Sequence, residues 1–540
     1  MSPCTPVASV RIHANVVRAS NEHVSDRHRQ GAGEHAGLGS CPVAKHVPSS
    51  DVDAVMAAAL DAARQLGVSD ASVRVETIRA QVVALRDGAL ETSSDDTEDG
   101  VGLRVVHDGS IGFAATADVS VDAAARLAHQ AVGAAKVVAA VRRRPLELAA
   151  EPGHGTVSWS SSYRTDPTAV PMAEKVARLA EWSRRLLGQK GIDHVTAHVR
   201  AVSESKHYAD LQGTVATQRR VRVHPSVEAV ALDPQGGFEA MRTCAPPVGR
   251  GWEYLDGEGW DWDTELDELP ELLAEKLASP SVDAGRYDLV IDPTNLWLTI
   301  HESIGHATEL DRALGYEAAY AGTSFATPDK LGTLRYGSPI MHVTGDRTAE
   351  HGLASVAIDD EGVAAQSFDL VKDGLLVGYQ LDRATASAAG YDRSNGCAFA
   401  DSPLHVPIQR MANVSLQPAP SEGPTTAELI AGVERGIFVV GDKSWSIDMQ
   451  RYNFQFTGQR FFRITAGRLD GQLRDVAYQG TTTEFWGSME AVGGRSTYLL
   501  AGAFNCGKGQ PGQVAPVSHG APSALVRNVN VLNARAEGGR

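Results

Sequence analysis

Two histidines and a glutamate lie within six residues, in the segment His301-Glu302-Ser303-Ile304-Gly305-His306. Imidazoles are good zinc ligands, and a neighbouring carboxylate can act as a general base. The surrounding segment predicts a helix, because Asp292 is a good N-cap and Pro293 suits a first turn. Apolar residues then recur every three or four positions from Leu296 to Leu310. Two interpretations follow: a metal-binding helix, or a helix with one buried and one surface histidine.

The spacing of the two histidines differs from that of the familiar zinc-protease helix. In His-Glu-x-x-His the imidazoles are four residues apart and share one face. His301 and His306 are five residues apart, which places them about 140° apart on a regular helix. A π-bulge would bring both to one ion, and Gly305 eases such a distortion because it has no Cβ. We therefore expect the helix to be widened or broken around residues 302–306.

A catalytic zinc site needs three protein ligands and one open position. The late Cys506 lies in a glycine-rich run, residues 503–513, which predicts a tight loop that folds back onto the helix. Its thiolate would be a good zinc ligand, although an ordinary buried cysteine is an equally good interpretation. Acidic residues offer further candidates: Glu309, Asp311, Asp359 and Asp360.

Each nearby acidic residue has a chemical and an ordinary interpretation. Glu302 lies about 100° around the helix from His301, where a general base lies in His-Glu-x-x-His sites, but it could also face solvent. Glu309 could accept a hydrogen bond from the imidazole of His306 or form a surface salt bridge. The run Asp359-Asp360-Glu361-Gly362 favours a β-turn over a metal cluster.

Bulk properties narrow the class of protein. The chain has 540 residues and a formal net charge of −16 without long basic clusters, so we expect no binding to nucleic acid or anionic membranes. Its five cysteines are scattered, which suits a reducing cytosol. No apolar run approaches the roughly 18 residues of a membrane helix, and the N-terminus lacks the apolar core of a secretory signal. These features predict a cytoplasmic protein.

The order of elements predicts an α+β fold. Residues 1–48 are polar and aperiodic, which indicates a disordered extension. Residues 50–285 read as an α+β domain, and residues 286–540 as a β-rich domain, barrel-like or a folded-over sheet, that carries the candidate metal helix. Hairpin turns are predicted at Asp87-Gly88, Asp108-Gly109, Asp373-Gly374 and Asp470-Gly471, and helices at 51–67, 120–141, 270–277 and 425–436.

The motif His301–His306 resembles the HExxxH signature of the TldD/PmbA family of metalloproteases, specifically its catalytic TldD-type subunit. Further segments agree with the family in the same order: Ser355–Gly362, Pro407–Asn413 and Asn505–Lys508. The resemblance covers roughly residues 50–535. One departure is Ala307, where family members often carry glycine.

The resemblance implies a function and a site. His301, His306 and Cys506 would bind one zinc ion per chain, and Glu302 would be the catalytic base. The family fold is an N-terminal α+β domain followed by a β-rich domain that encloses the site. The family also implies a peptide substrate and a dimer, either a homodimer or a heterodimer with a PmbA/TldE-type chain.

The residues and the resemblance together predict a zinc-dependent peptidase that cleaves or trims unfolded peptides. Three alternatives stay open from the sequence. The chain could be a metal-dependent hydrolase of a non-peptide amide, a non-catalytic assembly subunit with a structural metal, or a thiol enzyme that uses Cys506.

Overall fold

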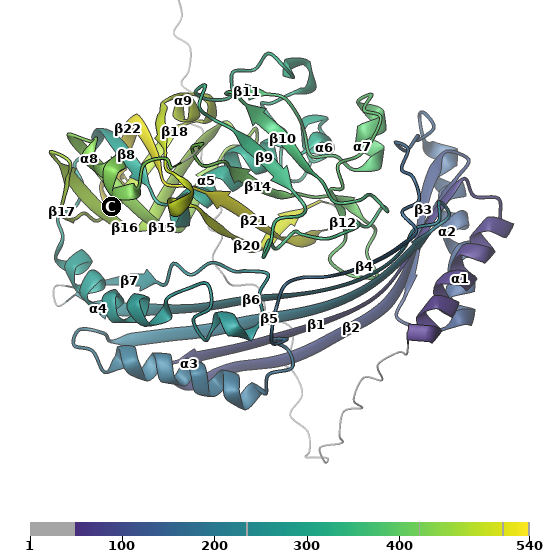
Figure 1. The fold of residues 1–540 in the computed structure, drawn as a ribbon, viewed down its shortest axis with the longest axis horizontal. Helices are drawn as coiled ribbons and strands as arrows, with labels where there is room; N and C mark the ends of the chain where they lie inside the picture. The colour runs from purple at the N-terminus through teal and green to yellow at the C-terminus, as the bar shows by residue number, and fades with distance from the viewer. Residues whose placement is uncertain (1–48, 234–235, 421, 510–511, 538–540) are drawn as a thin grey trace, which may run out of the picture. The chain divides into compact units, whose positions relative to one another are not determined.

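The computed structural model describes residues 49–233, 236–420, 422–509 and 512–537 (Figure 1). The predicted disordered extension, residues 1–48, lies outside the described residues. The described residues belong to one compact unit. A boundary between two domains near residue 285 therefore stays a prediction.

A seven-stranded sheet dominates the first half, in the order β3-β2-β1-β5-β6-β4, with β7 paired to β6. Its strands are β1 Asp70–Arg86, β2 Ala89–His107, β3 Ser110–Thr116, β4 Thr156–Ser160, β5 His194–Asp210, β6 Val215–Leu232 and β7 Phe238–Arg242. The predicted turns at Asp87-Gly88 and Asp108-Gly109 are confirmed, and all four residues have positive φ, as type I′ turns require. Strand β2 runs unbroken between these turns.

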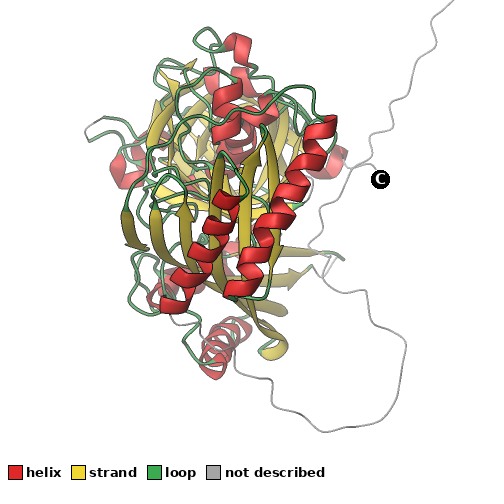
Figure 2. Cartoon of the chain, turned by 90° about the vertical axis from the view of Figure 1, so that its right-hand side faces the viewer, coloured by secondary structure: helices red, strands yellow, loops and turns green. Residues whose placement is uncertain are grey.

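Four helices cover one face of this sheet: α1 Ser49–Gln65, α2 Val121–Val141, α3 Met172–Leu187 and α4 Trp262–Ala278. Figure 2 shows long helices lying across the sheet on the side that faces the viewer. Alternation along β1 explains the layering, because neighbouring side chains of a strand point to opposite faces. Val73 and Val75 pack with α1 and α2, and Val83 and Leu85 pack with α3 and α4. Helix α4 begins at Trp262, eight residues before the predicted start at Pro270, because Asp261 caps it by accepting a hydrogen bond from the backbone N–H of Thr264.

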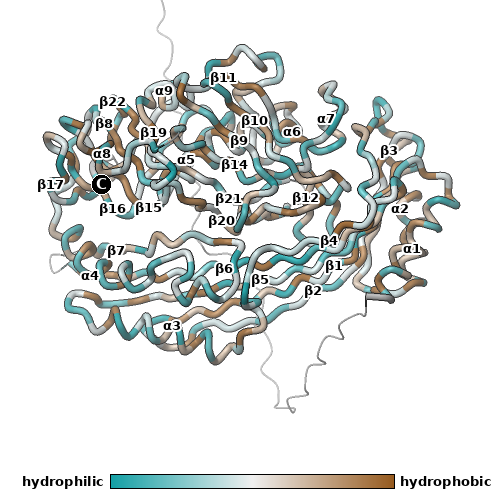
Figure 3. The backbone as a smooth tube through the Cα atoms, viewed as in Figure 1, coloured by the Kyte–Doolittle hydropathy of each residue, from teal (hydrophilic) through white to brown (hydrophobic). Residues whose placement is uncertain are grey.

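The opposite face of the long strands carries charged side chains that are buried against the second half of the chain. Arg74, Glu76, Glu204, Lys206 and Arg220 are each at most 5% exposed. Figure 3 shows hydrophilic positions along these strands as well as hydrophobic ones. This face is therefore a buried polar interface within the unit.

A closed five-stranded barrel organises the second half and confirms the predicted α+β fold. Its ring is β15-β8-β22-β18-β16, closed by pairing of β15 with β16. The strands are β8 Gly285–Ile291, β15 Arg435–Ile447, β16 Asn453–Thr465, β18 Val476–Thr481 and β22 Ala524–Asn533, with β17 Arg468–Gln472 and β19 Met489–Val492 attached. The turn predicted at Asp470-Gly471 is wrong: both residues lie inside β17, and the chain turns at Ala466-Gly467, which has positive φ at both positions.

Smaller elements surround the barrel. They are β9 Val343–Asp346, β10 Ser367–Lys372, β11 Leu375–Leu376, β12 Ala398–Phe399, β13 Ile408–Gln409, β14 Asn413–Leu416, β20 Leu499–Lys508 and β21 Gln513–Ala521. The short helices are α6 Leu310–Ala313, α7 Arg383–Ala388, α8 Thr426–Ala431, α9 Thr482–Gly487 and α10 Ala534–Glu537. The sequence had predicted α8 alone among these, because helices of four to six residues are too short to show a 3.6-residue period. Among the described helices, none has the length and apolarity needed to cross a membrane.

Candidate metal centre

Helix α5, Pro293–Ile300, leads directly into the motif and confirms the predicted widening. Asp292 caps α5 by accepting a hydrogen bond from the backbone N–H of Thr294 at 2.9 Å. The next five residues, His301–Gly305, form a π-helical turn in which the backbone N–H of His306 donates to the carbonyl of His301. An i→i+5 bond of this kind brings residues five apart to the same face of the helix.

Side chains satisfy the carbonyl groups that this irregular turn leaves without regular helical partners. Gln380 donates from Nε2 to the carbonyl of Gly305 at 2.7 Å, and the Thr308 hydroxyl donates to the carbonyl of Ile304 at 2.8 Å. Gly305 itself has an ordinary helical φ of −52°. A Cβ at this position would lie 2.5 Å from Sδ of Met411. Glycine is therefore required here because a larger residue would clash with Met411, and not because the backbone adopts an unusual conformation.

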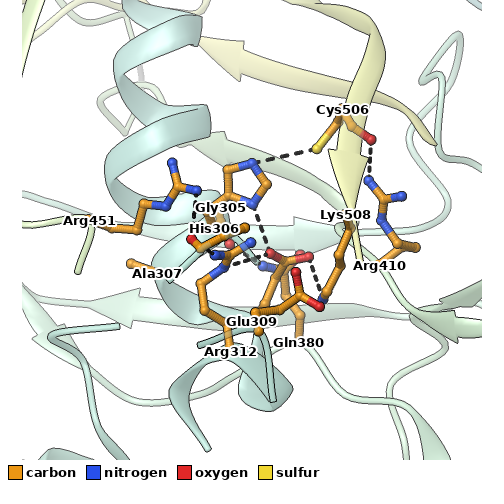
Figure 4. Close-up of polar contacts among 12 residues, drawn as sticks. Gly305, His306, Ala307, Glu309, Arg312, Gln380, Arg410, Arg451, Cys506 and Lys508 are labelled. Atoms are coloured by element: carbon orange, nitrogen blue, oxygen red, sulfur yellow. Dashed lines mark hydrogen bonds and ion pairs between the residues drawn. The ribbon is translucent and has the colours of Figure 1, made fainter. Parts of the chain in front are cut away.

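The structure brings His301, His306 and Cys506 together. Their potential ligand atoms all lie within 4.8 Å of one another, and the three residues are 3–5% exposed. Sγ of Cys506 lies 3.6 Å from Nε2 of His306 (Figure 4). Among the described residues, this is the one group of three or more His, Cys, Asp or Glu side chains with metal-ligand spacing.

Cys506 reaches the histidines from a strand, and the predicted tight loop is wrong. It lies in β20 and pairs with Ala515 of β21, next to an irregularity in the ladder between Ala503 and Cys506. The glycine-rich run 503–513 suggested a loop, but β20 continues to Lys508. Just before the run, Gly502 lets the two strands approach closely, because a Cβ there would lie 2.1 Å from the carbonyl oxygen of Val517. The expectation that this segment folds back onto the helix is confirmed.

The hydrogen bonds of both imidazoles leave Nε2 free to bind a metal. His519 donates from Nδ1 to the carbonyl of Val414 at 2.9 Å, so its Nε2 accepts a hydrogen bond from Nδ1–H of His301 at 2.7 Å. His306 donates from Nδ1 to the carboxylate of Glu309 at 2.8 Å. Burial lowers the pKa of His301, His306 and His519, which favours the neutral imidazoles that metals bind.

Buried charges surround Cys506 and Glu309. Burial raises the pKa of the Cys506 thiol, but His306 and Arg410 outweigh burial, so the pKa lies below its ordinary value. Burial also acts to raise the pKa of Glu309, yet Lys508 and His306 hold it well below the usual range. Nζ of Lys508 lies 3.0 Å from the Glu309 carboxylate. Glu309 is therefore a buried hydrogen-bond partner of His306 and not a surface ion-pair residue.

Glu302 is also buried, which excludes the solvent-facing alternative. Its side chain accepts a hydrogen bond from Nη1 of Arg451 at 2.7 Å, and the residue is 4% exposed. Arg451 lies on the connection between β15 and β16 and has a φ of 64°. The guanidinium therefore holds the Glu302 carboxylate in one orientation.

The remaining acidic candidates lie apart from the three grouped side chains. Asp359 and Gly362 form the predicted turn, with the Gly362 N–H donating to the Asp359 carbonyl at 3.2 Å. Asp360 is paired with Lys206 at 2.5 Å. Asp311 is paired with Lys508 at 2.8 Å.

Sequence reasoning missed His519, Arg451 and Lys508 as parts of this centre. In the sequence, Lys508 was identified only as the last residue of the segment Asn505–Lys508, without a role of its own. His519 lies on β21, the partner strand of β20, so strand order and register were needed to place it. Arg451 is isolated on a connection, and no signal in the sequence links it to Glu302.

Comparison with known proteins identifies the family of the chain. Two domain models match the chain: the PmbA/TldA metallopeptidase C-terminal domain at residues 284–533 and PmbA/TldA metallopeptidase domain 1 at residues 71–135. Together they cover more than half of the chain.

Three curated relatives have metalloprotease names. A metalloprotease of Methanothermobacter thermautotrophicus is 29% identical over 86% of this chain and 95% of its own length. A metalloprotease TldD homolog of Haemophilus influenzae is 26% identical over 83% of this chain and 89% of its own length. A zinc metalloprotease TldD homolog of Saccharolobus solfataricus is 25% identical over 50% of this chain and 57% of its own length.

Solved structures share the fold at low sequence identity. A crystal structure from Thermotoga maritima has a TM-score of 0.71 at 16% identity and covers 89% of this chain and 100% of its own. TldE from Thermococcus kodakarensis has a TM-score of 0.65 at 15% identity and covers 88% of this chain and 99% of its own. On the domain matches, the chain belongs to the PmbA/TldD family of metallopeptidases.

Proposed function

We propose that this chain is a zinc-dependent peptidase whose metal ligands are His301, His306 and Cys506. The observation that carries the proposal is the 3.6 Å separation between Sγ of Cys506 and Nε2 of His306. A tetrahedral zinc ion with ordinary Zn–S and Zn–N bonds holds such atoms about 3.5 Å apart. Three protein ligands also leave a fourth position open, which is typical of catalytic zinc.

The donor set suits zinc chemically. Two neutral imidazoles and a thiol of lowered pKa match the nitrogen and sulfur ligands that zinc prefers. His519 and Glu309 hold the outer nitrogens of the two imidazoles, an arrangement that commonly orients metal-binding histidines. Bound zinc polarises a carbonyl group and lowers the pKa of water to about 7. The word "zinc" in the name of the Saccharolobus solfataricus relative agrees with this choice of metal.

Glu302 is the general base of the proposed reaction. It takes a proton from the attacking water and delivers it to the amine that leaves when the peptide bond breaks. Arg451 positions the Glu302 carboxylate through the 2.7 Å hydrogen bond. Because the side chain of Glu302 is only 6% exposed and that of Arg451 13% exposed, the proton moves within a site from which bulk water is largely excluded.

The proposal extends to substrate, assembly and location. The substrates are unfolded peptides, and residues 286–540 form the peptidase domain behind an N-terminal domain of residues 50–285. The chain acts in the cytoplasm as a dimer, with itself or with a TldE-type chain. The structural likeness to TldE from Thermococcus kodakarensis is compatible with such pairing, because a common fold allows related interfaces.

Substitution of Glu302 by Gln tests the proposed reaction. The purified variant should keep about one zinc per chain, because Glu302 is not a proposed ligand, yet lose cleavage of fluorogenic unfolded peptides. Glu268→Gln removes the same charge from an exposed position and should retain both zinc and activity. Wild-type rates from Glu302→Gln would refute the role of Glu302, and rates unaffected by a zinc chelator would refute the proposed function as a whole.

A further inference from the structure

A small cavity lies inside the second half of the chain, against the charged face of the long sheet. Its volume is about 10 Å³, and Arg220, Arg347 and Arg410 line it together with Phe399 and Met411. A cavity of roughly this size accommodates a single water-sized guest. The three arginines are 5%, 2% and 1% exposed, respectively. The cavity is therefore a nearly solvent-free space with three cationic side chains in its wall.

Arg347 has no carboxylate partner within salt-bridge distance in the described part of the chain. Its Nε and Nη2 are buried and make no hydrogen bond. Asp359 and Asp360 act on it electrostatically, but both are held by other donors. Asp359 accepts from three backbone N–H groups, and Asp360 pairs with Lys206 and Arg74.

The thiol of Cys397 is also an electrostatic neighbour of Arg347, but it provides no negative charge. Burial raises the pKa of this thiol to about 12, so it is neutral near pH 7. Among the described residues around Arg347, Cys397 is neutral and Asp360 already has two cationic partners. Burial and Glu361 raise the pKa of Asp359 to about 7, so this carboxyl group supplies only part of a counter-charge near neutral pH.

The other two arginines do not remove this excess of positive charge. Arg410 donates to the backbone carbonyls of Gln513 and Cys506, and its buried Nε has no partner. Arg220 pairs with Glu204, but Arg222 shares the same carboxylate at 2.9 Å. In the part of the chain that the structure describes, the guanidinium groups of Arg220, Arg222, Arg347 and Arg410 therefore have one carboxylate, Glu204, within salt-bridge distance.

We propose that this cavity binds one small monovalent anion of the halide class, with chloride as the physiological occupant. A buried charge without a counter-ion is strongly destabilising, and an unsatisfied buried donor in a folded protein calls for a bound partner. Water could accept the free N–H bonds but would leave the charge uncompensated. The cavity is too small for a phosphate group or a peptide carboxylate, so size selects a single-atom anion.

The proposed anion site adjoins the proposed zinc site, because Arg410 also donates to the backbone carbonyl of Cys506, but the two sites share no proposed ligand. It contains no histidine or cysteine, and its arginines do not contact Glu302 in the described structure. Its test therefore needs neither metal nor peptidase activity.

Anion exchange at constant ionic strength tests the proposal on the full chain. Replacing sodium gluconate by sodium chloride at neutral pH should raise the Tm in a saturable manner, because the anion binds the folded state. Sulfate should give no saturable rise. Crystals soaked in sodium bromide should show an anomalous peak between the guanidinium groups of Arg220, Arg347 and Arg410. An equal Tm in chloride and gluconate, or a bromide map without that peak, would overturn the proposal.

Two variants separate this site from a general salt effect. Arg347→Met keeps the side-chain length, removes the unpaired charge, and should abolish the saturable response to chloride. Arg335→Met removes an equal charge from an exposed position and should keep that response. A chloride response that persists in Arg347→Met would also overturn the assignment, and the wild-type titration remains decisive if that variant does not fold.

Discussion

Sγ of Cys506 lies 3.6 Å from Nε2 of His306, although 200 positions of sequence separate the two residues. Two local structures make this approach possible. The π-helical turn at His301–Gly305 brings the two histidines together, and the pairing of β20 with β21 carries Cys506 to them. A metal centre assembled in this way depends on packing far beyond the three proposed ligands.

Glu309→Gln should weaken zinc binding about 10- to 100-fold, because His306 would lose the anionic partner of its Nδ1–H. Competition with a chromophoric zinc chelator measures the affinity. Glu350→Gln, at a position with 74% exposed side chain, is the matched control and should leave the affinity unchanged. Equal affinities for the two variants would show that Glu309 does not support the metal.

Arg451→Met should lower kcat by up to about 100-fold without loss of zinc, because the Glu302 carboxylate would lose the group that orients it. Arg451→Lys should restore part of the rate, since it keeps a positive charge. Steady-state kinetics and metal analysis on the same samples measure both effects. Loss of zinc from Arg451→Met would instead indicate a structural role.

Gly305→Ala should destabilise the protein by about 1–3 kcal/mol, because the added Cβ would lie 2.5 Å from Sδ of Met411. The combination with Met411→Ala should cost less than the sum of the two single changes, since the smaller side chain makes room. Urea unfolding of the two single variants and the double variant gives this coupling. Additive costs would contradict the close contact.

Metal-free protein should lose stability as the pH falls below about 6.5. Burial lowers the pKa of His301, His306 and His519 in the folded state, so the unfolded chain binds protons that the folded chain does not. The loss starts near the ordinary imidazole pKa and continues down to the lower folded values, at up to about 1.4 kcal/mol per pH unit for each histidine.

Urea unfolding in chelator at several pH values between about 7.5 and 5.5 measures this loss, and most carboxyl groups titrate below that range. His519→Gln should give a shallower slope than the wild type. Burial raises the pKa of Asp359 and Asp382 to about 7, which acts in the opposite direction in this range, so the difference between the two slopes carries the test. Equal slopes for His519→Gln and the wild type would contradict the lowered pKa of His519.

The sequence predicted the chemistry of the centre better than its surroundings. The five-residue spacing of His301 and His306 predicted a widened helix, because two ligands of one ion must share a face. The predicted location of Cys506 was wrong, because the glycine-rich run was interpreted as one loop although β20 continues through Cys506 to Lys508. Strand order and register, which local patterns do not encode, were needed to place His519 and Arg451.

In the fold, too, local residue patterns predicted some turns and helices correctly, whereas others depended on contacts between residues distant in the sequence. Asp87-Gly88 and Asp108-Gly109 marked real turns because both residues of each pair adopt positive φ. Asp470-Gly471 carries the same signal but lies within β17, where pairing with β16 and packing on α4 decide the conformation. Short helices such as α7 depend on a local cap, here Asp382 with Thr385, more than on periodicity.

X-ray absorption at the zinc edge tests the central claim most directly. For the zinc-loaded wild type, we expect about two nitrogen scatterers at about 2.0–2.1 Å and one sulfur scatterer at about 2.3 Å. In Cys506→Ser the sulfur shell should disappear, whereas in Cys244→Ser it should remain. A wild-type spectrum without a sulfur shell, or one unchanged by Cys506→Ser, would contradict the assignment of His301, His306 and Cys506 as the metal ligands.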